Sequence, residues 1–381
     1  ELYIHIPFCV RKCSYCDFLS APATEQTREA YMAALFAEIG GRAKDYSDRT
    51  VTSIFIGGGT PSLLSGEQIG QLMDRIREQF AMAQDAEITM EVNPGTANAE
   101  KLRNFYTAGI NRLSIGMQSA QAEELKNLGR IHDFEGFCQV YREAVEAGFT
   151  NINVDIMSGL PGQTLASYRD TLEKVLHLEP MPQHISAYSL IVEEGTPFAA
   201  MAERGELPLP EEETERAMYE ETIEVLSKYG FHRYEISNYA RDGYECRHNV
   251  GYWIRRDYLG FGIGAASLID NVRFQNEKSL GAYLAHPLES REEEQTLTVQ
   301  DRMEETMFLG LRLTRGVSCV DFAEQYGRTV EEVYGEVIAR NVADGLLTVT
   351  ERKENQKKDR FLALTKRGLD LSNYVMAQFL F

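Results

Sequence analysis

The sequence predicts an α/β protein: a partial (β/α)6 TIM-like barrel followed by a smaller C-terminal α+β domain that is winged-helix-like. Two observations carry this prediction. In the first half, short runs, most of them rich in Ile and Val, alternate with stretches whose apolar residues recur at helical spacing, and after about residue 298 helices are followed by two β-type runs. Repeated βα units imply a parallel sheet covered by helices. Six units fit a partial barrel better than a closed eightfold one, and a doubly wound open sheet remains the alternative.

The individual elements of the first half follow from these patterns. Several of the expected strands lead directly into Gly or Pro, and several of the expected helices end at Gly, as helices often do. The expected strands are Leu2–Ile6, Ser53–Ile56, Glu87–Glu91, Arg112–Gly116, Asn151–Ile156 and His184–Leu190. The expected helices between them include Glu29–Ile39, Gly66–Phe80, Ala99–Ala108 and Phe134–Ala147.

Three parts are expected along the chain. Residues 1–200 form the barrel with its cofactor site, residues 201–290 extend the barrel, and residues 291–381 form the C-terminal domain. The extension begins with a Pro-containing linker and an acidic helix that ends near Gly230, and residues 231–290 look irregular. In the C-terminal domain we expect the helices Asp301–Leu311, Val317–Tyr326 and Val330–Ala343, two strands, Leu346–Thr350 and Arg360–Leu364, around a charged tip, and a last helix after Gly368.

Composition limits the possible partners and location. Lys and Arg total 39 against 58 Asp and Glu, giving a formal charge of −19. Such a surface repels phosphate backbones, and the one short basic run, Lys353 to Arg360, does not offset it, so no nucleic-acid partner is expected. No apolar run approaches the ~20 residues needed to span a bilayer, and the start of the sequence lacks the features of a signal peptide. A cytoplasmic location is therefore expected.

Three of the six cysteines lie within eight positions near the N-terminus. Cys9, Cys13 and Cys16 form a CxxxCxxC motif directly after the first expected strand, which places them at the barrel mouth where active sites of this architecture lie. Three thiolates on one loop can each bind one iron of a cubane cluster, while structural clusters and structural zinc usually take four ligands. The missing fourth ligand would leave one iron open to a small molecule. Zinc with His5 as a distant ligand, or a redox CxxC pair, are the alternatives.

CxxxCxxC with an aromatic residue, Tyr15, just before the third cysteine resembles the radical S-adenosylmethionine (SAM) superfamily. The resemblance implies a [4Fe–4S] cluster on the three cysteines and SAM bound to the open iron, where reduction cleaves it to a 5′-deoxyadenosyl radical. It extends over essentially the whole chain and is closest to the oxygen-independent coproporphyrinogen III oxidase group, and within that group to its haem chaperone branch.

Matching positions imply the SAM contacts. Polar residues recur at the ends of successive expected strands, which by itself indicates a site at the barrel mouth, and the glycines after the second strand allow close backbone approach. No catalytic residue is assigned. The expected SAM contacts are Tyr3, Tyr15, Gly58, Gly59, Thr60, Pro61, Glu91, Gln118, Arg130 and Asp155.

Two features favour the haem chaperone branch. The oxidases carry a fourth cysteine one residue beyond the third, whereas here Asp17-Phe18 follows Cys16. A His-Asn-x-x-Tyr-Trp run begins at His248 and resembles the signature of the chaperone branch; its imidazole could contact haem iron, and nearby Cys246 could add a thiolate or an attachment point. The alternative is that the run consists of packed core residues.

The expected function is therefore a haem chaperone that binds haem, a [4Fe–4S] cluster and SAM and transfers haem to haem-requiring respiratory proteins. Its partners would be haem or a porphyrin and the acceptor proteins, with peripheral contact to a membrane through such a partner, and the chain would be a monomer or homodimer. The alternatives are a radical SAM enzyme acting on a porphyrinogen, a radical SAM methyltransferase, or a cluster that serves as a redox sensor. Whether SAM is turned over stays open.

Overall fold

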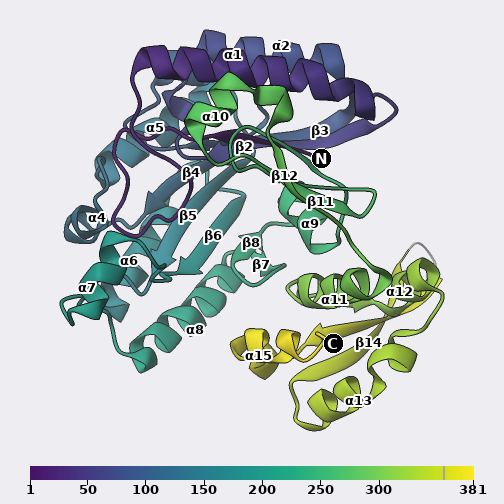
Figure 1. Ribbon diagram of the computed structural model, residues 1–381. Helices are drawn as coiled ribbons and strands as arrows, with labels where there is room; N and C mark the ends of the chain where they lie inside the picture. Colours follow the sequence, from purple (N-terminus) through teal and green to yellow (C-terminus); the bar gives the residue numbers. More distant parts are fainter. Residues whose placement is uncertain (355–356) are drawn as a thin grey trace.

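The computed structural model describes residues 1–354 and 357–381 and shows the expected α/β architecture with a smaller C-terminal α+β region (Figure 1). The first six strands are all found, most of them longer than expected. They are β1 (Leu2–Ile6), β2 (Thr50–Gly58), β3 (Ala81–Val92), β4 (Arg112–Gln118), β5 (Ile152–Ser158) and β6 (His184–Ser189). The connecting helices are α1 (Glu25–Arg42), η1 (Ala43–Tyr46), η2 (Pro61–Leu63), α2 (Gly66–Gln79), α3 (Ala99–Thr107), α4 (Ala122–Leu128), α5 (Phe134–Ala147) and α6 (Leu165–Leu176).

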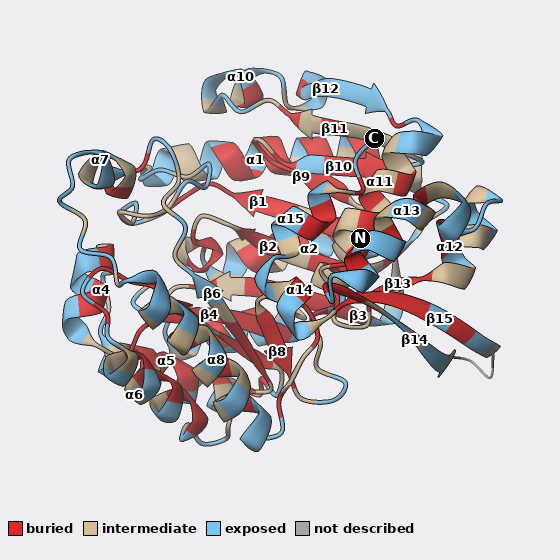
Figure 2. Cartoon of the chain, turned by 90° about the horizontal axis from the view of Figure 1, so that it is seen from below, coloured by how far each residue is buried: buried red, intermediate tan, exposed pale blue. Residues whose placement is uncertain are grey.

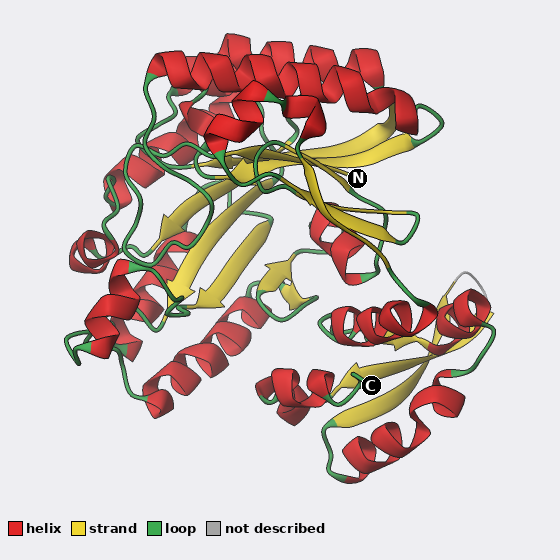
Figure 3. Cartoon of the chain, in the orientation of Figure 1, coloured by secondary structure: helices red, strands yellow, loops and turns green. Residues whose placement is uncertain are grey.

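The strand order decides between a barrel and a doubly wound sheet. The nine-stranded sheet runs β7-β8-β6-β5-β4-β3-β2-β1-β9, where β7 is His232–Arg233, β8 is Asn238–Ala240 and β9 is Leu259–Phe261. Strands β1 to β6 are therefore neighbours in chain order and pair in parallel. A doubly wound sheet reverses its strand order at a switch point, and no such reversal occurs within β1 to β6. The sheet is therefore a curved, incomplete barrel with helices on its outer face (Figure 3).

Helix α2 illustrates how the local sequence fixes each unit. Ser65 caps its N-terminus and exchanges hydrogen bonds with Gln68, which satisfies two otherwise free backbone N–H groups. The apolar residues recur at i, i+3, i+4 and i+7 and form one buried face. They are Ile69, Leu72, Met73 and Ile76.

The prediction that residues 231–290 are irregular was wrong. This part of the chain supplies three strands to the main sheet, and one of them, β9, pairs in parallel with β1. These strands have only two or three residues, so no periodicity marks them. Two of them, β8 and β9, join the sheet by pairing with the distant strands β6 and β1, and β7 pairs with the nearby β8. The elements between residues 197 and 296 are α7 (Pro197–Glu203), α8 (Glu212–Lys228), β7 (His232–Arg233), β8 (Asn238–Ala240), α9 (Arg247–Trp253), β9 (Leu259–Phe261), β10 (Ala266–Ile269), β11 (Val272–Asn276), α10 (Leu280–Ala285), η3 (Pro287–Glu289) and β12 (Arg291–Thr296).

The strands β10, β11 and β12 form a separate antiparallel sheet. Every residue of β12 is exposed, whereas the central strands of the main sheet are buried (Figure 2). Among the described helices, none has both the length and the apolar character required to cross a bilayer.

The C-terminal region has the expected order of helices and a β-hairpin, with its own apolar core around Met307, Phe322 and Val375. Several boundaries differ from the prediction. Residues 317–318 form a short strand before the second helix, both hairpin strands extend further toward the tip, and the final helical segment begins at Lys366 and is interrupted at Leu371. The centre of the predicted charged tip, residues 355–356, lies outside the described residues. The elements are α11 (Val299–Gly310), β13 (Val317–Ser318), α12 (Cys319–Tyr326), α13 (Val330–Ala343), β14 (Leu347–Glu354), β15 (Lys357–Leu364), α14 (Lys366–Asp370) and α15 (Ser372–Ala377).

Candidate functional site

The three motif cysteines lie on the loop between β1 and α1, at the carboxyl end of the strands. Backbone hydrogen bonds from Ala21 to Pro7 and from Cys9 to Ala21 close the base of this loop, at 2.9 and 3.1 Å. Its tip is held by Ser14, whose N–H donates to Leu128 at the end of α4 and whose carbonyl accepts from the start of α7, both at 3.0 Å. The loop is therefore fixed from both sides at the barrel mouth.

The donor set fits an iron–sulfur cluster. All three cysteines are free and half-buried, and two of the thiols face polar donors from other loops: the Thr60 hydroxyl lies 3.4 Å from Cys9 Sγ, and Arg130 Nη1 lies 3.8 Å from Cys13 Sγ. Donors and a cation next to thiolates stabilise their negative charge. The superfamily's three-thiolate cluster therefore has a suitable loop here.

The zinc alternative is not supported by the position of His5. Its Nδ1 is hydrogen-bonded to the Tyr3 hydroxyl at 3.0 Å and its Nε2 to the Leu19 carbonyl at 2.9 Å. Burial lowers the pKa of His5. With both ring nitrogens engaged, the imidazole braces the end of the cysteine loop and is not directed at the thiols.

A cavity of about 500 Å³ adjoins the cysteine loop across the carboxyl ends of β2 to β6. That volume is within the range of small-molecule sites. The predicted site residues that line it are Cys9, Cys13, Cys16, Tyr15, Gly58, Gly59, Thr60, Glu91, Gln118, Arg130 and Asp155. Three predicted residues do not line it: Tyr3, Pro61 and His248.

Glycine is required at positions 58 and 59 because the backbone there packs closely against the residues from His5 to Phe8. A Cβ on Gly59 would lie 2.7 Å from the Phe8 carbonyl and 2.8 Å from the Ile6 carbonyl. Gly58 has φ +106°, and a Cβ there would meet the His5 ring. Gly58 and Gly59 thus allow the cavity wall to pack against the start of the cysteine loop, and they also leave room for a ligand to approach the backbone.

Two carboxylates face the cavity from adjacent parts of the sheet. Glu91 accepts a hydrogen bond from the Gly58 N–H at 3.1 Å, and burial, followed by the charge of Asp155, raises the pKa of Glu91 to about 8. Asp155 accepts from the Tyr188 hydroxyl at 2.8 Å and from Asn153 at 2.7 Å, and burial raises its pKa as well. Together they can accept hydrogen bonds from hydroxyl or ammonium groups of a ligand.

Gln118 and Arg130 leave buried polar atoms without a partner in the structure. Gln118 Oε1 is one of them, and the residue is 8% exposed with an unusual φ of +69°. Arg130 donates to Gly116 at 2.7 Å and to Asn93 at 3.0 Å, while its Nε has no partner. Buried polar groups are normally satisfied, and backbone strain is concentrated at functional sites. Both observations point to a polar ligand in the cavity.

Tyr3 and Pro61 have other surroundings than the cavity. The Tyr3 hydroxyl bonds to His5, and Pro61 is buried at the start of η2. The structure does not test whether either residue contacts SAM, so both contacts remain predictions.

The haem contact expected for His248 stays a prediction, and in this structure the side chain is packed and hydrogen-bonded within the core. His248 is 1% exposed, its Nδ1 lies 2.9 Å from the Ser53 hydroxyl, and its Nε2 lies 3.1 Å from the Tyr252 hydroxyl. Burial lowers its pKa to about 3. Cys246 is fully buried, and burial raises the pKa of its thiol to about 12, so it offers no thiolate. The packed-core alternative for this run is the one that the geometry supports.

Sequence reasoning missed Tyr188, Asn93 and Ser114, which also line the cavity. Tyr188 and Ser114 point inward from β6 and β4, where alternation along the strand could have indicated them. Asn93 holds Arg130 and follows Glu91 by two residues, so its place in the Glu-Val-Asn-Pro segment was the available signal.

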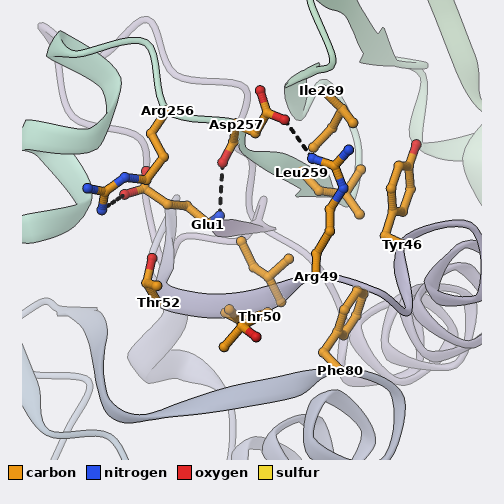
Figure 4. A pocket seen from close by; sticks show the side chains of 12 residues that line it. Glu1, Tyr46, Arg49, Thr50, Thr52, Phe80, Arg256, Asp257, Leu259 and Ile269 are labelled. Carbon is orange, nitrogen blue, oxygen red and sulfur yellow. Dashed lines mark hydrogen bonds and ion pairs between the residues drawn. The ribbon is translucent and has the colours of Figure 1, made fainter. Parts of the chain in front are cut away.

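A second cavity, of about 290 Å³, lies at the opposite end of the barrel, where β1 and β2 begin (Figure 4). Arg49 crosses it to contact Asp257 at 2.6 Å and Asp270 at 2.5 Å. The amino ends of barrel strands usually serve stability, and these ion pairs join β2 to the segments around β9 and β10.

Comparisons with known proteins identify the family of this chain. The model of the radical SAM superfamily matches residues 3–175, and that of the HemN C-terminal domain matches residues 297–371. Heme chaperone HemW from Bacillus subtilis is 38% identical over 99% of this chain and 98% of its own length. HemW from Lactococcus lactis is 36% identical over 99% of this chain and 96% of its own. The chain belongs to the HemW family of radical SAM proteins.

Among solved structures, coproporphyrinogen III oxidase (HemN) from Escherichia coli, described as a radical SAM enzyme, superposes with a TM-score of 0.85. It is 28% identical and covers 100% of this chain and 89% of its own. This match supports the barrel and the C-terminal region together. Membership of the superfamily implies a [4Fe–4S] cluster and SAM as the cofactors of the site.

Proposed function

We propose that this protein is a haem chaperone that binds haem and transfers it to haem-requiring proteins, while retaining the cluster and SAM sites of its superfamily. The observation that carries this proposal is the full-length match to relatives named heme chaperone HemW, 38% and 36% identical over 99% of the chain. The match to coproporphyrinogen III oxidase is weaker, at 28% identity.

Cys9, Cys13 and Cys16 would hold the [4Fe–4S] cluster. When bound, the cluster supplies an electron and an open iron site, and SAM supplies a reducible carbon–sulfur bond. Around them, Arg130 neutralises thiolate charge, and Thr60 donates toward Cys9.

The cavity residues would position SAM by complementary polar contacts. Glu91 and Asp155 are suited to accept from the amino group and the ribose hydroxyls. Gln118 Oε1 is free to accept a further donor, and the Arg130 fork suits a carboxylate.

A porphyrinogen-modifying enzyme is the second candidate, because the whole chain superposes on coproporphyrinogen III oxidase with a TM-score of 0.85. The motif argues against it: Phe18 stands where the oxidases carry their fourth cysteine.

The cellular setting is also part of the proposal. We place the protein in the cytoplasm as a monomer or homodimer, with haem-requiring respiratory proteins as acceptors and membrane contact only through them. We also propose that the chain is divided into residues 1–200, 201–290 and 291–381. The C-terminal region has a separate apolar core, which makes it a candidate for docking of the acceptor protein.

The test is anaerobic reconstitution of the cluster, addition of one equivalent of haem, and gel filtration with absorption spectra. SAM and dithionite are then added, and 5′-deoxyadenosine and porphyrin products are assayed together. Co-elution of haem without porphyrin conversion, and transfer of that haem to an apo acceptor, supports the chaperone. Conversion of coproporphyrinogen without haem retention supports the enzyme instead.

A further inference from the structure

Apolar side chains are exposed at the rim of the cavity that adjoins the cysteines. Phe18 is 60% exposed, Ile191 is 67% exposed and Tyr188 is 36% exposed, and all three line the same cavity as the motif cysteines. Phe18 comes from the end of the cysteine loop, while Tyr188 and Ile191 come from the end of β6 and the segment after it. We call these three residues the apolar rim. An exposed apolar surface at the mouth of a polar cavity usually marks a site of interaction.

Two cations lie beside the apolar rim. Arg11 and Lys12 line the cavity and, within the part of the chain that the structure describes, donate to the carbonyls of Gly129 and Phe18 instead of forming ion pairs. Two carboxylates, Asp17 and Glu193, also line the cavity. In a chain with a formal charge of −19, two adjacent cations without a carboxylate partner form a local site for negative charge.

We propose that haem binds at the apolar rim, with the porphyrin face against Phe18 and Ile191 and its propionates near Arg11 and Lys12. The inference rests on the proposed function and locates the haem site of that function. Haem combines a flat apolar ring with two carboxylates at one edge, and the rim offers the complementary arrangement. Haem and SAM would then share one end of the barrel.

The identity of residue 18 supports this placement. It is an exposed aromatic ring that lies two residues after the third cysteine of the motif. An aromatic ring provides a stacking surface and has no redox chemistry of its own. The ring therefore suits a surface that holds a porphyrin and releases it unchanged.

The competing location is the run that begins at His248, at the other end of the barrel. Helix α9 lies away from the strand ends that carry the cavity (Figure 1). His248 is bonded to Ser53 in the first half of β2, whereas Gly58 at the end of β2 lines the cavity. Haem at His248 would require α9 to leave the barrel, while haem at the rim requires no change in the core.

The experiment is an anaerobic titration of ferric haem into the full chain with its cluster reconstituted and SAM present, followed by Soret absorbance. The variants are Phe18→Glu and Ile191→Glu, and the matched control is Tyr374→Glu, because Tyr374 is 62% exposed on α15 in the C-terminal region. We expect each rim variant to raise the Kd for haem at least tenfold and the control to leave it within twofold. Surface substitutions of this kind rarely unfold a protein, and iron content per chain verifies the cluster. If Phe18→Glu loses iron, Ile191→Glu decides the test.

A second arm tests the cations. Arg11→Gln with Lys12→Gln should weaken binding of haem but not of its dimethyl ester, in which the carboxylates are blocked.

The possible outcomes separate the inference from the proposed function. Wild-type protein that retains no haem contradicts the proposed function itself. Wild-type protein that binds haem, with rim variants that bind equally well, overturns the rim site and leaves the chaperone function standing. Loss of haem in His248→Gln, at an unchanged melting temperature and with rim variants unaffected, assigns the haem to α9.

Discussion

Gly59→Ala should disturb the cysteine loop through backbone contact alone. Gly59 does not have a positive φ, so the substitution adds no dihedral strain. Its new Cβ would lie 2.7 Å from the Phe8 carbonyl and 2.8 Å from the Ile6 carbonyl, where carbon contacts ordinarily need about 3.5 Å. Both atoms belong to the backbone that leads into Cys9, so they cannot move aside as a flexible side chain would.

The expected cost can be estimated from the contacts that must change. Overpacking costs about 1–3 kcal/mol. The hydrogen bonds from Gly59 to Ile6, at 2.9 Å, and from Thr60 to Phe8, at 2.7 Å, lie at the same junction, and each contributes about 1 kcal/mol. Overpacking together with the loss of one of these bonds costs about 2–4 kcal/mol, which in a protein of 381 residues lowers the melting temperature by about 2–5 °C.

Gly70→Ala is the matched control. Gly70 lies inside α2, and a Cβ there has no neighbour within 4 Å, so alanine should stabilise the helix by up to about 1 kcal/mol. The measurements are the melting temperature and the iron bound per chain after anaerobic reconstitution. Gly59→Ala should lower both, whereas Gly70→Ala should leave iron unchanged. Equal iron content and equal melting temperatures for the two variants would refute the reasoning.

Three further predictions concern buried polar groups. Burial raises the pKa of Glu91 to about 8 from its ordinary 4.5. The stability that its protonated form contributes is complete below about pH 4.5 and is lost as the pH rises through about 8. In denaturant titrations of the cluster-free protein, Glu91→Gln should therefore flatten the decline in unfolding free energy over that pH range. His248→Leu leaves two buried hydroxyls without their partner and should cost about 2–3 kcal/mol in thermal unfolding while haem affinity stays unchanged; a large loss of haem without destabilisation would contradict this. Glu305→Ala removes the carboxylate that holds Arg255 at 2.8 Å and Arg273 at 2.6 Å and should cost about 3 kcal/mol; an unchanged denaturation midpoint would show that this contact between barrel and C-terminal region is unimportant.

Much of the fold could be predicted because the signals were local. The apolar runs of β1 to β6 alternate with amphipathic helices, and the differences from the prediction lie at the ends of strands and helices, as in α1, which is Glu25–Arg42 instead of Glu29–Ile39. The β3 strand begins six residues earlier than predicted because its first part, Ala81 to Asp85, is largely exposed and lacks the Ile and Val that mark a buried strand. Strands β7 to β9 could not be predicted, since two or three residues carry no period, and the partners that bring β8 and β9 into the main sheet, β6 and β1, are far away in the chain.

The site could be predicted to a similar degree and for a different reason. Motif positions at successive strand ends must converge because parallel strands end at one edge, and the cavity brings most of them together. Their assignment to SAM stays a prediction. The unpartnered Oε1 of Gln118 and the φ of +69° at that residue could not be predicted, because both depend on packing across β4 and on its neighbours.

The run from His248 to Trp253 shows that resemblance to a family does not by itself establish the role of a single residue. The backbone N–H of His248 donates to Glu87 at 3.1 Å, and the Arg312 guanidinium of the C-terminal region lies 4.3 Å from the Trp253 ring. The run therefore joins the middle of β3 to the C-terminal region. A signature can persist in a family because it holds two parts of the fold together, and its side chains are then occupied with one another. The haem affinity of the rim variants, compared with that of the His248 variant, separates a structural signature from a ligand site in this family.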